Sequence, residues 1–224
     1  MKRKAAAEAL KLVKDGMILG IGSGSTVREF IKLLGDSKID SKTIVCIPSS
    51  FDTENMLISN GMKVGTLNQY PAIDMTVDGA DRVDKDLNLI KGGGGALLRE
   101  KVIAAASKLL VIIVDDSKMV QALEGSFPIP VEVIPHAKEF VEKELLKLKG
   151  TPHLRKASDK LGPTVTDNGN IILDTDFSSI SKPEELEKTI NNIPGVMENG
   201  FFSRKLVAQV IVASDKEIKI LKKE

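Results

Sequence analysis

The sequence has few of the residues on which several kinds of chemistry depend. Its 224 residues include one cysteine, two histidines, one tyrosine and no tryptophan. The single cysteine, Cys46, excludes an internal disulfide and a cysteine-cluster metal site. The histidines, His136 and His153, do not have the HExxH spacing of a zinc site. The shortage of aromatic rings leaves little for stacking against single-stranded nucleic acid.

The balance of charges argues against nucleic acid and anionic membranes as partners. The chain has 32 basic and 31 acidic side chains, so its formal net charge is +1 and no overall basic field attracts nucleic acid or an anionic membrane. No apolar run reaches the ~20 residues that span a bilayer. The basic residues 1–4 precede an amphipathic helical pattern rather than the apolar core of a signal peptide. We therefore expect a cytoplasmic protein that binds neither nucleic acid nor membrane.

Apolar runs that alternate with helical patterns predict the fold. Strands that are apolar on both faces indicate a parallel sheet covered by helices on both sides. The sequence thus favours an open, mostly parallel, Rossmann-like α/β sheet. The expected strands are 17–21, 43–48, 62–64, 73–77 and 110–114, and the expected helices are 4–14, 27–34, 52–60 and 96–109.

The pattern changes near residues 127–130. The elements expected beyond this point are strand 131–134, helix 137–148, a strand around 152–157, a hairpin at 167–169, helix 183–191 and an extended segment within 193–202. Their β-α-β-β-α-β order is typical of a small α+β, ferredoxin-like domain. Residues 205–214 are apolar again and are expected to return to the first sheet. We therefore predict a catalytic domain of residues 1–126 with 198–224, and a second domain of residues 127–197.

A loop rich in glycine and serine follows the first predicted strand, with the sequence Gly20-Ile21-Gly22-Ser23-Gly24-Ser25-Thr26. Small residues allow a tight turn that points backbone N–H groups outward, and the helix that follows adds its positive end. These features suit a phosphate group. The loop lacks the Gly-Lys-Ser/Thr of a Walker A motif and the third glycine of a dinucleotide fingerprint. The alternative is a tight turn with a serine N-cap and no ligand.

Two more clusters follow predicted strands of the same sheet. Asp78-Gly79-Ala80-Asp81 can converge two carboxylates on a small polar molecule, although aspartate is also a common turn former. Lys91-Gly92-Gly93-Gly94-Gly95 precedes a helix that contains Glu100. Four consecutive glycines lose much conformational entropy when they become ordered on folding. Close approach of their backbone to a ligand is a reason for such a run to be present. The alternative is a flexible linker with a surface charge pair.

The reactive residues that the sequence contains limit the reactions that the protein can catalyse. A Ser-His-Asp triad has no histidine near the glycine loops, and Cys46 lies in an apolar strand, as an inert core thiol does. Phosphate-binding loops, three carboxylates and a lysine remain. They suit acid–base chemistry on a small phosphorylated metabolite. No cluster of histidine, cysteine and acidic residues has the spacing of metal ligands, so we expect no metal ion.

In order and spacing, these clusters resemble the signature motifs of the type A ribose-5-phosphate isomerases. Residues 22–26, 78–81 and 91–101 match three motifs, and 115–118 and 127–133 match two more. The resemblance continues through 166–170 and 193–196, so it covers nearly the whole chain. One departure is Arg82, where members of the family usually have glutamate.

The resemblance implies interconversion of ribose 5-phosphate and ribulose 5-phosphate through an enediolate. It implies that Glu100 moves the proton between C2 and C1, that Lys91 and the glycine loop stabilise the oxyanion, and that Asp78 and Asp81 bind sugar hydroxyls. Asp78 is also a candidate for assisting ring opening, and Lys2 for assisting at the phosphate. The residues implied to contact substrate are Ser23, Gly24, Ser25, Thr26, Asp78, Gly79, Ala80, Asp81, Lys91, Gly92, Gly93, Gly94 and Lys118. The second domain is implied to act as a lid and as an oligomer contact, in a homodimer or homotetramer.

Two other functions compete with this one. A sugar-phosphate sensor can share the sheet and the phosphate loop, but a sensor of the repressor type needs a basic helix-turn-helix, for which residues before 17 leave no room. Another phosphosugar enzyme, such as an amino-sugar phosphate deaminase, relies on a histidine in the sheet domain, and the first domain has none. An assay of ribulose 5-phosphate formation distinguishes all three.

Overall fold

A computed structural model describes residues 1–41, 43–123, 125, 127–158, 161–178, 180 and 182–222. The chain forms two compact units. The first unit comprises residues 1–80, 99–119 and 204–224, and the second comprises 81–98 and 120–203. The boundaries of these units differ from those of the predicted domains, because segments 81–98, 120–126 and 198–203 belong to the second unit.

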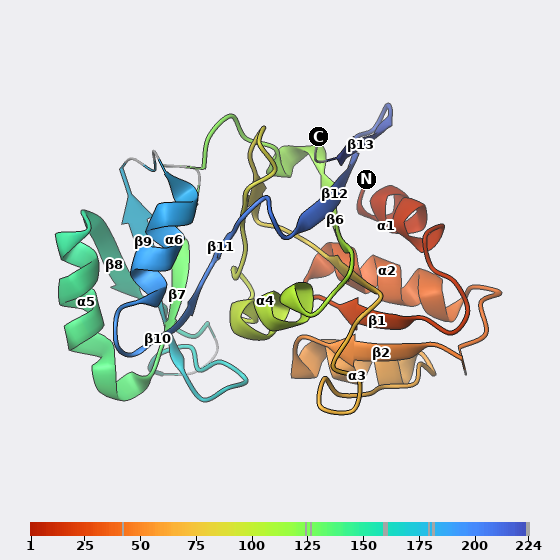
Figure 1. Cartoon of the computed structure of the whole chain (residues 1–224), viewed down its shortest axis with the longest axis horizontal. Helices are drawn as coiled ribbons and strands as arrows, with labels where there is room; N and C mark the ends of the chain where they lie inside the picture. The colour runs from red at the N-terminus through yellow and green to blue at the C-terminus, as the bar shows by residue number, and fades with distance from the viewer. Residues whose placement is uncertain are drawn as a thin grey trace. The chain divides into compact units, whose positions relative to one another are not determined.

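The first unit is built on a six-stranded sheet (Figure 1). Its strands are β1 (Ile18–Ile21), β2 (Val45–Pro48), β3 (Met75–Asp78), β6 (Leu110–Asp115), β12 (Val207–Ala213) and β13 (Ile218–Lys222). Across the sheet they follow the order β13-β12-β6-β3-β1-β2. Every neighbouring pair is parallel except β12 and β13. The predicted parallel sheet is therefore confirmed, including the return of the chain in β12.

Helices cover both faces of this sheet, as the apolar strands require. Helices α1 (Lys2–Leu10), α2 (Ser25–Gly35) and α3 (Phe51–Ser59) contribute to the core on one face. Helix α4 (Leu97–Ala105) supplies Ile103 to the core on the other face, where it meets Val45 and Ile47 of β2. Between these two residues, Cys46 points into the first core. Alternate residues of one strand thus fill two cores, which confirms the predicted fold class.

The second unit contains a four-stranded antiparallel sheet with two helices. Its elements are β7 (Ile129–Val133), α5 (Lys138–Lys147), β8 (Gly150–Leu154), β9 (Ile171–Phe177), α6 (Pro183–Asn191) and β10 (Val196–Asn199). The sheet order β10-β7-β9-β8 is that of a ferredoxin-like domain, as the element order predicts. A small sheet of β11 (Phe201–Phe202), β5 (Leu89–Ile90) and β4 (Arg82–Val83) completes the unit.

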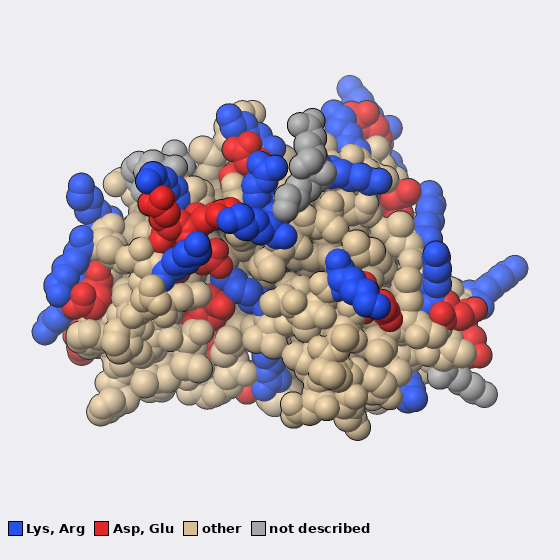
Figure 2. All heavy atoms as spheres, viewed as in Figure 1, with Lys and Arg blue, Asp and Glu red and all other residues tan. Residues whose placement is uncertain are grey.

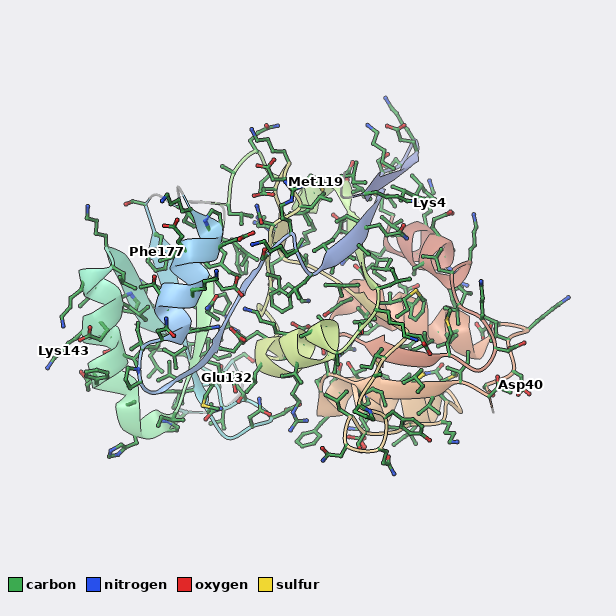
Figure 3. The ribbon with its side chains drawn as sticks, viewed as in Figure 1. Lys4, Asp40, Met119, Glu132, Lys143 and Phe177 are labelled. Carbon is green, nitrogen blue, oxygen red and sulfur yellow. The ribbon has the colours of Figure 1, made fainter. Side chains whose placement is uncertain are left out.

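One carboxylate is fully buried in the second unit. Glu132 lies on β7, and its Oε1 accepts hydrogen bonds from Thr166 Oγ1 at 2.9 Å, Asn168 Nδ2 at 3.0 Å and Asn170 Nδ2 at 2.8 Å (Figure 3). Hydrogen bonds to a charged acceptor are stronger than neutral ones. Glu132 therefore fixes the turn at residues 166–170, one of the segments in which the sequence resembles the isomerase family.

Several local features differ from the sequence prediction, and strands β4 and β5 are among those not predicted. Residues 62–64 form only a single bridge, between Val64 and Cys46, rather than a strand. Helix α4 ends at Ala105 instead of continuing to residue 109. The edge strand β13 is not predicted, because its isoleucines alternate with lysines and Ile218 and Ile220 remain exposed.

The surface carries charge of both signs. On the face drawn in Figure 2, basic and acidic side chains lie interspersed, in keeping with the net charge of +1. None of the described helices has the length and hydrophobicity that crossing a bilayer requires.

Candidate active site

The topology of the first sheet marks one position as a ligand site. Strand β2 lies on one side of β1, and β3 lies on the other. The chain therefore adds strands on one side of β1 first and on the other side afterwards. Open α/β sheets bind ligands at such a point, at the carboxyl ends of the strands. The predicted loop 22–26 follows β1, and Asp78 ends β3. Two of the predicted clusters thus lie at this position.

The loop after β1 presents a helix N-terminus. Gly24 precedes α2 with φ of +104°, and no side chain caps this helix, so the serine N-cap considered from the sequence is absent. Ser25 is exposed, and Lys2 Nζ donates a hydrogen bond to its Oγ at 2.9 Å. Backbone N–H groups and an ammonium group therefore meet at one spot, an arrangement that suits an anion such as phosphate.

Ser23 has a different environment from Ser25. Its hydroxyl lies 2.9 Å from both Ser49 Oγ and Ser50 Oγ, and 3.2 Å from Thr53 Oγ1. These residues join the end of β2 to the start of α3. The Ser23 side chain thus belongs to a hydroxyl network that holds the loop in place. The sequence analysis did not identify Ser49, Ser50 or Thr53, although a run of hydroxyl residues after a strand is visible there.

Asp78 is fully buried and fixes the same loop. Its Oδ1 accepts the N–H of Ser23 at 3.3 Å and the N–H of Gly79 at 2.7 Å. A Cβ on Gly22 would lie 1.8 Å from Asp78 Oδ1, so only glycine fits at position 22. Ala80 follows and ends the first segment of this unit.

Glu100 and Lys118 belong to the same unit. Helix α4 precedes β6, which is the parallel neighbour of β3, and the helix of such a crossover starts near the carboxyl ends of the strands. Glu100, in its first turn, is therefore at the end of the sheet that holds Asp78, and it is only 4% exposed. Lys118 is half-buried on the single turn η1 (Asp116–Lys118) directly after β6.

Asp81 and the four-glycine loop belong to the second unit. The Asp81 N–H donates to Ile90 O at 2.9 Å, which places its side chain beside the end of β5. Asp81 Oδ2 in turn accepts the N–H of Gly93 at 2.8 Å. A Cβ on Gly93 would lie 2.7 Å from Asp81 Oδ1. The carboxylate of Asp81 is therefore close against the backbone of the glycine loop.

Lys91 is a buried cation at the start of this loop. It is 3% exposed, its N–H donates to Gly200 O at 2.8 Å, and its Nζ lies 5.5 Å from the centre of the Phe202 ring. A cation over an aromatic face gains electrostatic attraction. Gly92 follows with φ of +96°, a conformation that favours glycine. The structure thus orders Lys91, Gly92 and Gly93, as the prediction of a ligand-binding loop requires, rather than leaving them as a linker.

Arg82 is the position at which the chain departs from the family pattern. Its Nη1 donates to the carbonyl oxygen of Asp81 at 2.6 Å, and its guanidinium lies 5.2 Å from the centre of the Phe127 ring. Arg82 therefore contacts the backbone of Asp81, while the Asp81 carboxylate accepts the N–H of Gly93.

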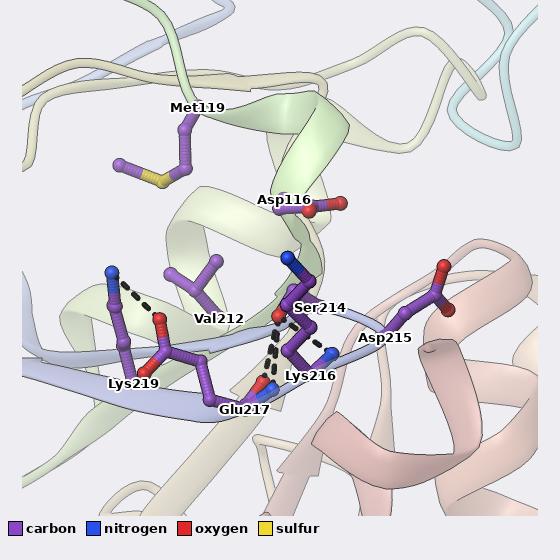
Figure 4. A pocket seen from close by; sticks show the side chains of 8 residues that line it. All are labelled: Asp116, Met119, Val212, Ser214, Asp215, Lys216, Glu217 and Lys219. Atoms are coloured by element: carbon purple, nitrogen blue, oxygen red, sulfur yellow. Dashed lines mark hydrogen bonds and ion pairs between the residues drawn. The ribbon is translucent and has the colours of Figure 1, made fainter.

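A pocket of about 500 Å³ lies at the carboxyl ends of β6 and β12 in the first unit (Figure 4). Asp116, Asp215 and Glu217 line it together with Lys216 and Lys219. Asp116 belongs to the turn that carries Lys118. The pocket therefore borders one predicted phosphate contact, on a side that the sequence analysis did not consider.

Two other groups bear on the chemistry. Burial raises the pKa of the Cys46 thiol to about 12, so this cysteine is a core residue rather than a nucleophile, as predicted. Within the described residues, no group of three histidine, cysteine or acidic side chains is placed to hold a metal ion.

The first unit thus offers an anion site, Asp78 and Glu100, and the second offers Asp81, Lys91 and an ordered glycine loop. Each unit of this α/β protein thus has groups of the kinds that acid–base chemistry on small phosphorylated molecules uses.

Comparisons with known proteins specify the class further. A sequence model of the family described as ribose 5-phosphate isomerase A (phosphoriboisomerase A) matches residues 45–217. The ribose-5-phosphate isomerase A of Methanococcus aeolicus is 48% identical over 222 residues, which cover 98% of this chain and 93% of that protein. The chain therefore belongs to the ribose 5-phosphate isomerase A family.

Solved structures agree with this assignment. The ribose 5-phosphate isomerase A of Methanocaldococcus jannaschii is 45% identical, with a TM-score of 0.94 over 99% of this chain and 98% of that one. A D-ribose-5-phosphate isomerase in complex with phospho-erythronic acid is 42% identical, with a TM-score of 0.96 over 99% of this chain and 97% of that one.

Proposed function

We propose that the protein interconverts D-ribose 5-phosphate and D-ribulose 5-phosphate without a cofactor. The observation that carries this proposal is the family match, by a sequence model over residues 45–217 and by a relative that is 48% identical over 98% of the chain. The purified protein is expected to form ribulose 5-phosphate from ribose 5-phosphate and to catalyse the reverse reaction. Absence of both reactions in folded protein would contradict the proposal.

In this mechanism Glu100 is the base. Its carboxylate removes the proton from C2 of the open-chain aldose, the C–H electron pair forms the C1–C2 double bond, and the carbonyl electrons move to O1. A proton then passes from O2 to O1, and Glu100 returns its proton to C1, which leaves the ketone at C2. A positioned general base contributes about 10²–10⁴-fold to such a rate. The low exposure of Glu100 supports this role, because a buried base is shielded from water.

Lys91 and the loop of Gly92, Gly93 and Gly94 stabilise the oxyanion that this step creates. Positive charge and backbone N–H groups that are already oriented lower the free energy of a transition state in which negative charge develops. The burial of Lys91 strengthens its electrostatic effect. Asp78 and Asp81 bind sugar hydroxyls, and Asp78 also assists ring opening. Gly79 and Ala80 connect these two carboxylates along the chain.

The phosphate end of the substrate binds to Gly24, Ser25 and Thr26 at the start of α2, to Lys118 and to Ser23. Lys2 assists through its hydrogen bond to Ser25. Phospho-erythronic acid, the compound held by the related structure, combines a phosphate with a carboxylate. We expect it to inhibit this protein in competition with ribose 5-phosphate, because its carboxylate can place negative charge where the enediolate oxygens form.

The proposed reaction requires no metal ion. Prolonged dialysis against a chelator is expected to leave the rate unchanged, and the control is the same protein dialysed against buffer alone. A large loss that one divalent ion restores would contradict the cofactor-free mechanism.

The proposal extends to assembly and location. The protein forms a homodimer or homotetramer, with residues 127–197 contributing contacts between copies, and it acts in the cytoplasm. Light scattering of the purified protein tests the assembly, and fractionation of the source cells tests the location.

A further inference from the structure

Arg155 lies outside every motif that the sequence analysis identified. It directly follows β8 in the second unit, and its backbone is held on both sides. Its N–H donates to Ile172 O at 2.9 Å, and its carbonyl oxygen accepts the N–H of Thr164 at 2.9 Å. The position of the Arg155 Cα is thus fixed by the sheet, so its side chain starts from an ordered backbone.

The Arg155 guanidinium joins an aspartate to the glycine loop. Its Nε donates to Asp174 Oδ2 at 2.8 Å, and Nη2 donates to the other carboxylate oxygen. Its Nη1 donates to Gly92 O at 2.8 Å and to Gly93 O at 3.1 Å. The side chains of Arg155 and Asp174 are only 15% and 22% exposed. A two-pronged, partly buried arginine–carboxylate pair is rigid and strong, unlike an exposed surface ion pair.

These bonds determine where the loop's N–H groups point. The C=O and N–H of one peptide unit point in opposite directions. With the carbonyls of Gly92 and Gly93 directed to Arg155, the N–H groups of Gly93 and Gly94 point away from it. The Gly93 N–H donates to Asp81 Oδ2. The Gly94 N–H has no partner within the described residues, and Gly94 is exposed. A cation on the carbonyl side also polarises these peptides and strengthens their N–H donors.

We propose that Arg155, held by Asp174, is a positioning residue that fixes the glycine loop with the Gly93 N–H on Asp81 and the Gly94 N–H directed toward the substrate oxyanion. This inference rests on the proposed isomerase function. Among the described residues, the Arg155 side chain donates hydrogen bonds only to Asp174 and to the carbonyls of Gly92 and Gly93, so it acts through the loop. The competing explanation is that the pair only stabilises the hairpin of β8 and β9.

The test compares Arg155→Met and Asp174→Asn with wild-type protein in two measurements. The first is steady-state kinetics with ribose 5-phosphate. We expect kcat to fall about 10–100-fold with KM changed less than about threefold, because oriented donors act mainly on the transition state. The second is hydrogen–deuterium exchange of the peptide that covers residues 89–98, which is expected to speed up in both variants. Arg155→Lys keeps the charge but not the forked geometry, so its kcat should lie between those of wild type and Arg155→Met.

Arg28→Met is the matched control. Arg28 also pairs with an aspartate, because its Nη2 donates to both carboxylate oxygens of Asp52, but both side chains are more than half exposed and belong to the first unit. The kcat of Arg28→Met, and the hydrogen–deuterium exchange of its peptide that covers residues 89–98, should equal those of wild type. Folded Arg155→Met with wild-type kcat would overturn the inference, and so would a lower kcat with unchanged loop exchange. If wild-type protein is inactive, the proposed function fails, and unchanged loop exchange in Arg155→Met would then still overturn the positioning role.

Discussion

Two glycine loops carry most of the proposed site, and they are held in different ways. The loop at residues 22–26 is fixed mainly by uncharged groups, namely the hydroxyls around Ser23 and the backbone bond of Gly22 to Val77 O at 3.0 Å, and by one carboxylate, that of Asp78. The loop at residues 92–95 is fixed by charge, with Asp81 on an N–H and Arg155 on two carbonyls. The first needs only to receive a phosphate that arrives already charged. The second has to stabilise charge that appears during the reaction, which requires donors oriented in advance.

The two loops share one feature, an aspartate against a glycine. Asp78 accepts the N–H of Ser23 and lies where a side chain on Gly22 would be, and Asp81 accepts the N–H of Gly93. The two carboxylates of the Asp78–Asp81 motif therefore each hold one loop. The sequence analysis treated substrate binding and turn formation as alternatives for this motif. The geometry shows a structural role for both carboxylates, and substrate binding by them remains part of the proposed function.

The largest effect is expected outside both loops, at Glu100. Glu100→Gln keeps the shape of the side chain but removes the base, so kcat should fall by about 10²–10⁴-fold with little change in KM. Thermal melting should be close to that of wild type. A kcat within a few-fold of wild type would assign the base to another residue.

Gly22→Ala and Gly93→Ala test the comparison itself. A methyl group at position 22 would meet the buried Asp78 carboxylate, so we expect a loss of about 1–3 kcal/mol or more in the free energy of unfolding. Gly93 is exposed and its methyl group would displace Asp81, so stability should change little while kcat falls about tenfold or more. Denaturant unfolding and steady-state kinetics measure both.

Gly94→Ala is the control for this pair, because a Cβ there meets no atom within 4 Å. It should be milder than Gly93→Ala in kcat and milder than Gly22→Ala in stability. The comparison of the loops would be wrong if Gly22→Ala were as stable as wild type or if Gly93→Ala retained full activity.

Lys118→Ala should weaken binding rather than catalysis. A charge-assisted bond to phosphate contributes about 1.5–3 kcal/mol, so KM should rise by roughly 10–100-fold. Some loss of kcat is allowed, because binding energy at the phosphate also aligns the sugar. An unchanged KM with a reduced kcat would remove Lys118 from the phosphate site and place it with the catalytic residues.

How far the sequence predicts this molecule depends on the range of the interactions. Local periodicity was sufficient for the helices and for most strands of the two larger sheets. The clusters after β1 and β3 could be located because parallel strands end at one edge. Arg155 could not be identified, since its partners in the glycine loop are more than sixty residues away along the chain, and Asp174 pairs with Arg155. The hydroxyl network around Ser23 depends in the same way on packing between β2 and α3. Strand β13 was missed because an exposed edge strand has little apolar pattern.

The smallest effect is expected at the opposite end of the sheet. Asp74 precedes β3, and its hydrogen bonds from Lys108 Nζ at 2.7 Å and the Ile18 N–H at 2.9 Å hold the pKa of its carboxyl below the usual 3.8. A lowered folded-state pKa adds stability above the unfolded pKa, and this stability is lost as pH falls through the folded-state value. Asp74→Asn should thus cost under about 1 kcal/mol at pH 7, because the pair is exposed. Melting at pH 7 and in strong acid should show the difference only at pH 7, with kcat unchanged.

The central claim is that Glu100 carries the proton between C2 and C1 of the pentose phosphate. Ribose 5-phosphate incubated with enzyme in D2O should incorporate deuterium at C2, which proton NMR follows directly. Wild-type protein is expected to catalyse this exchange along with isomerisation, and Glu100→Gln is expected to lose both together. Exchange at the wild-type rate in Glu100→Gln would contradict the account, because it would show that another group removes the C2 proton.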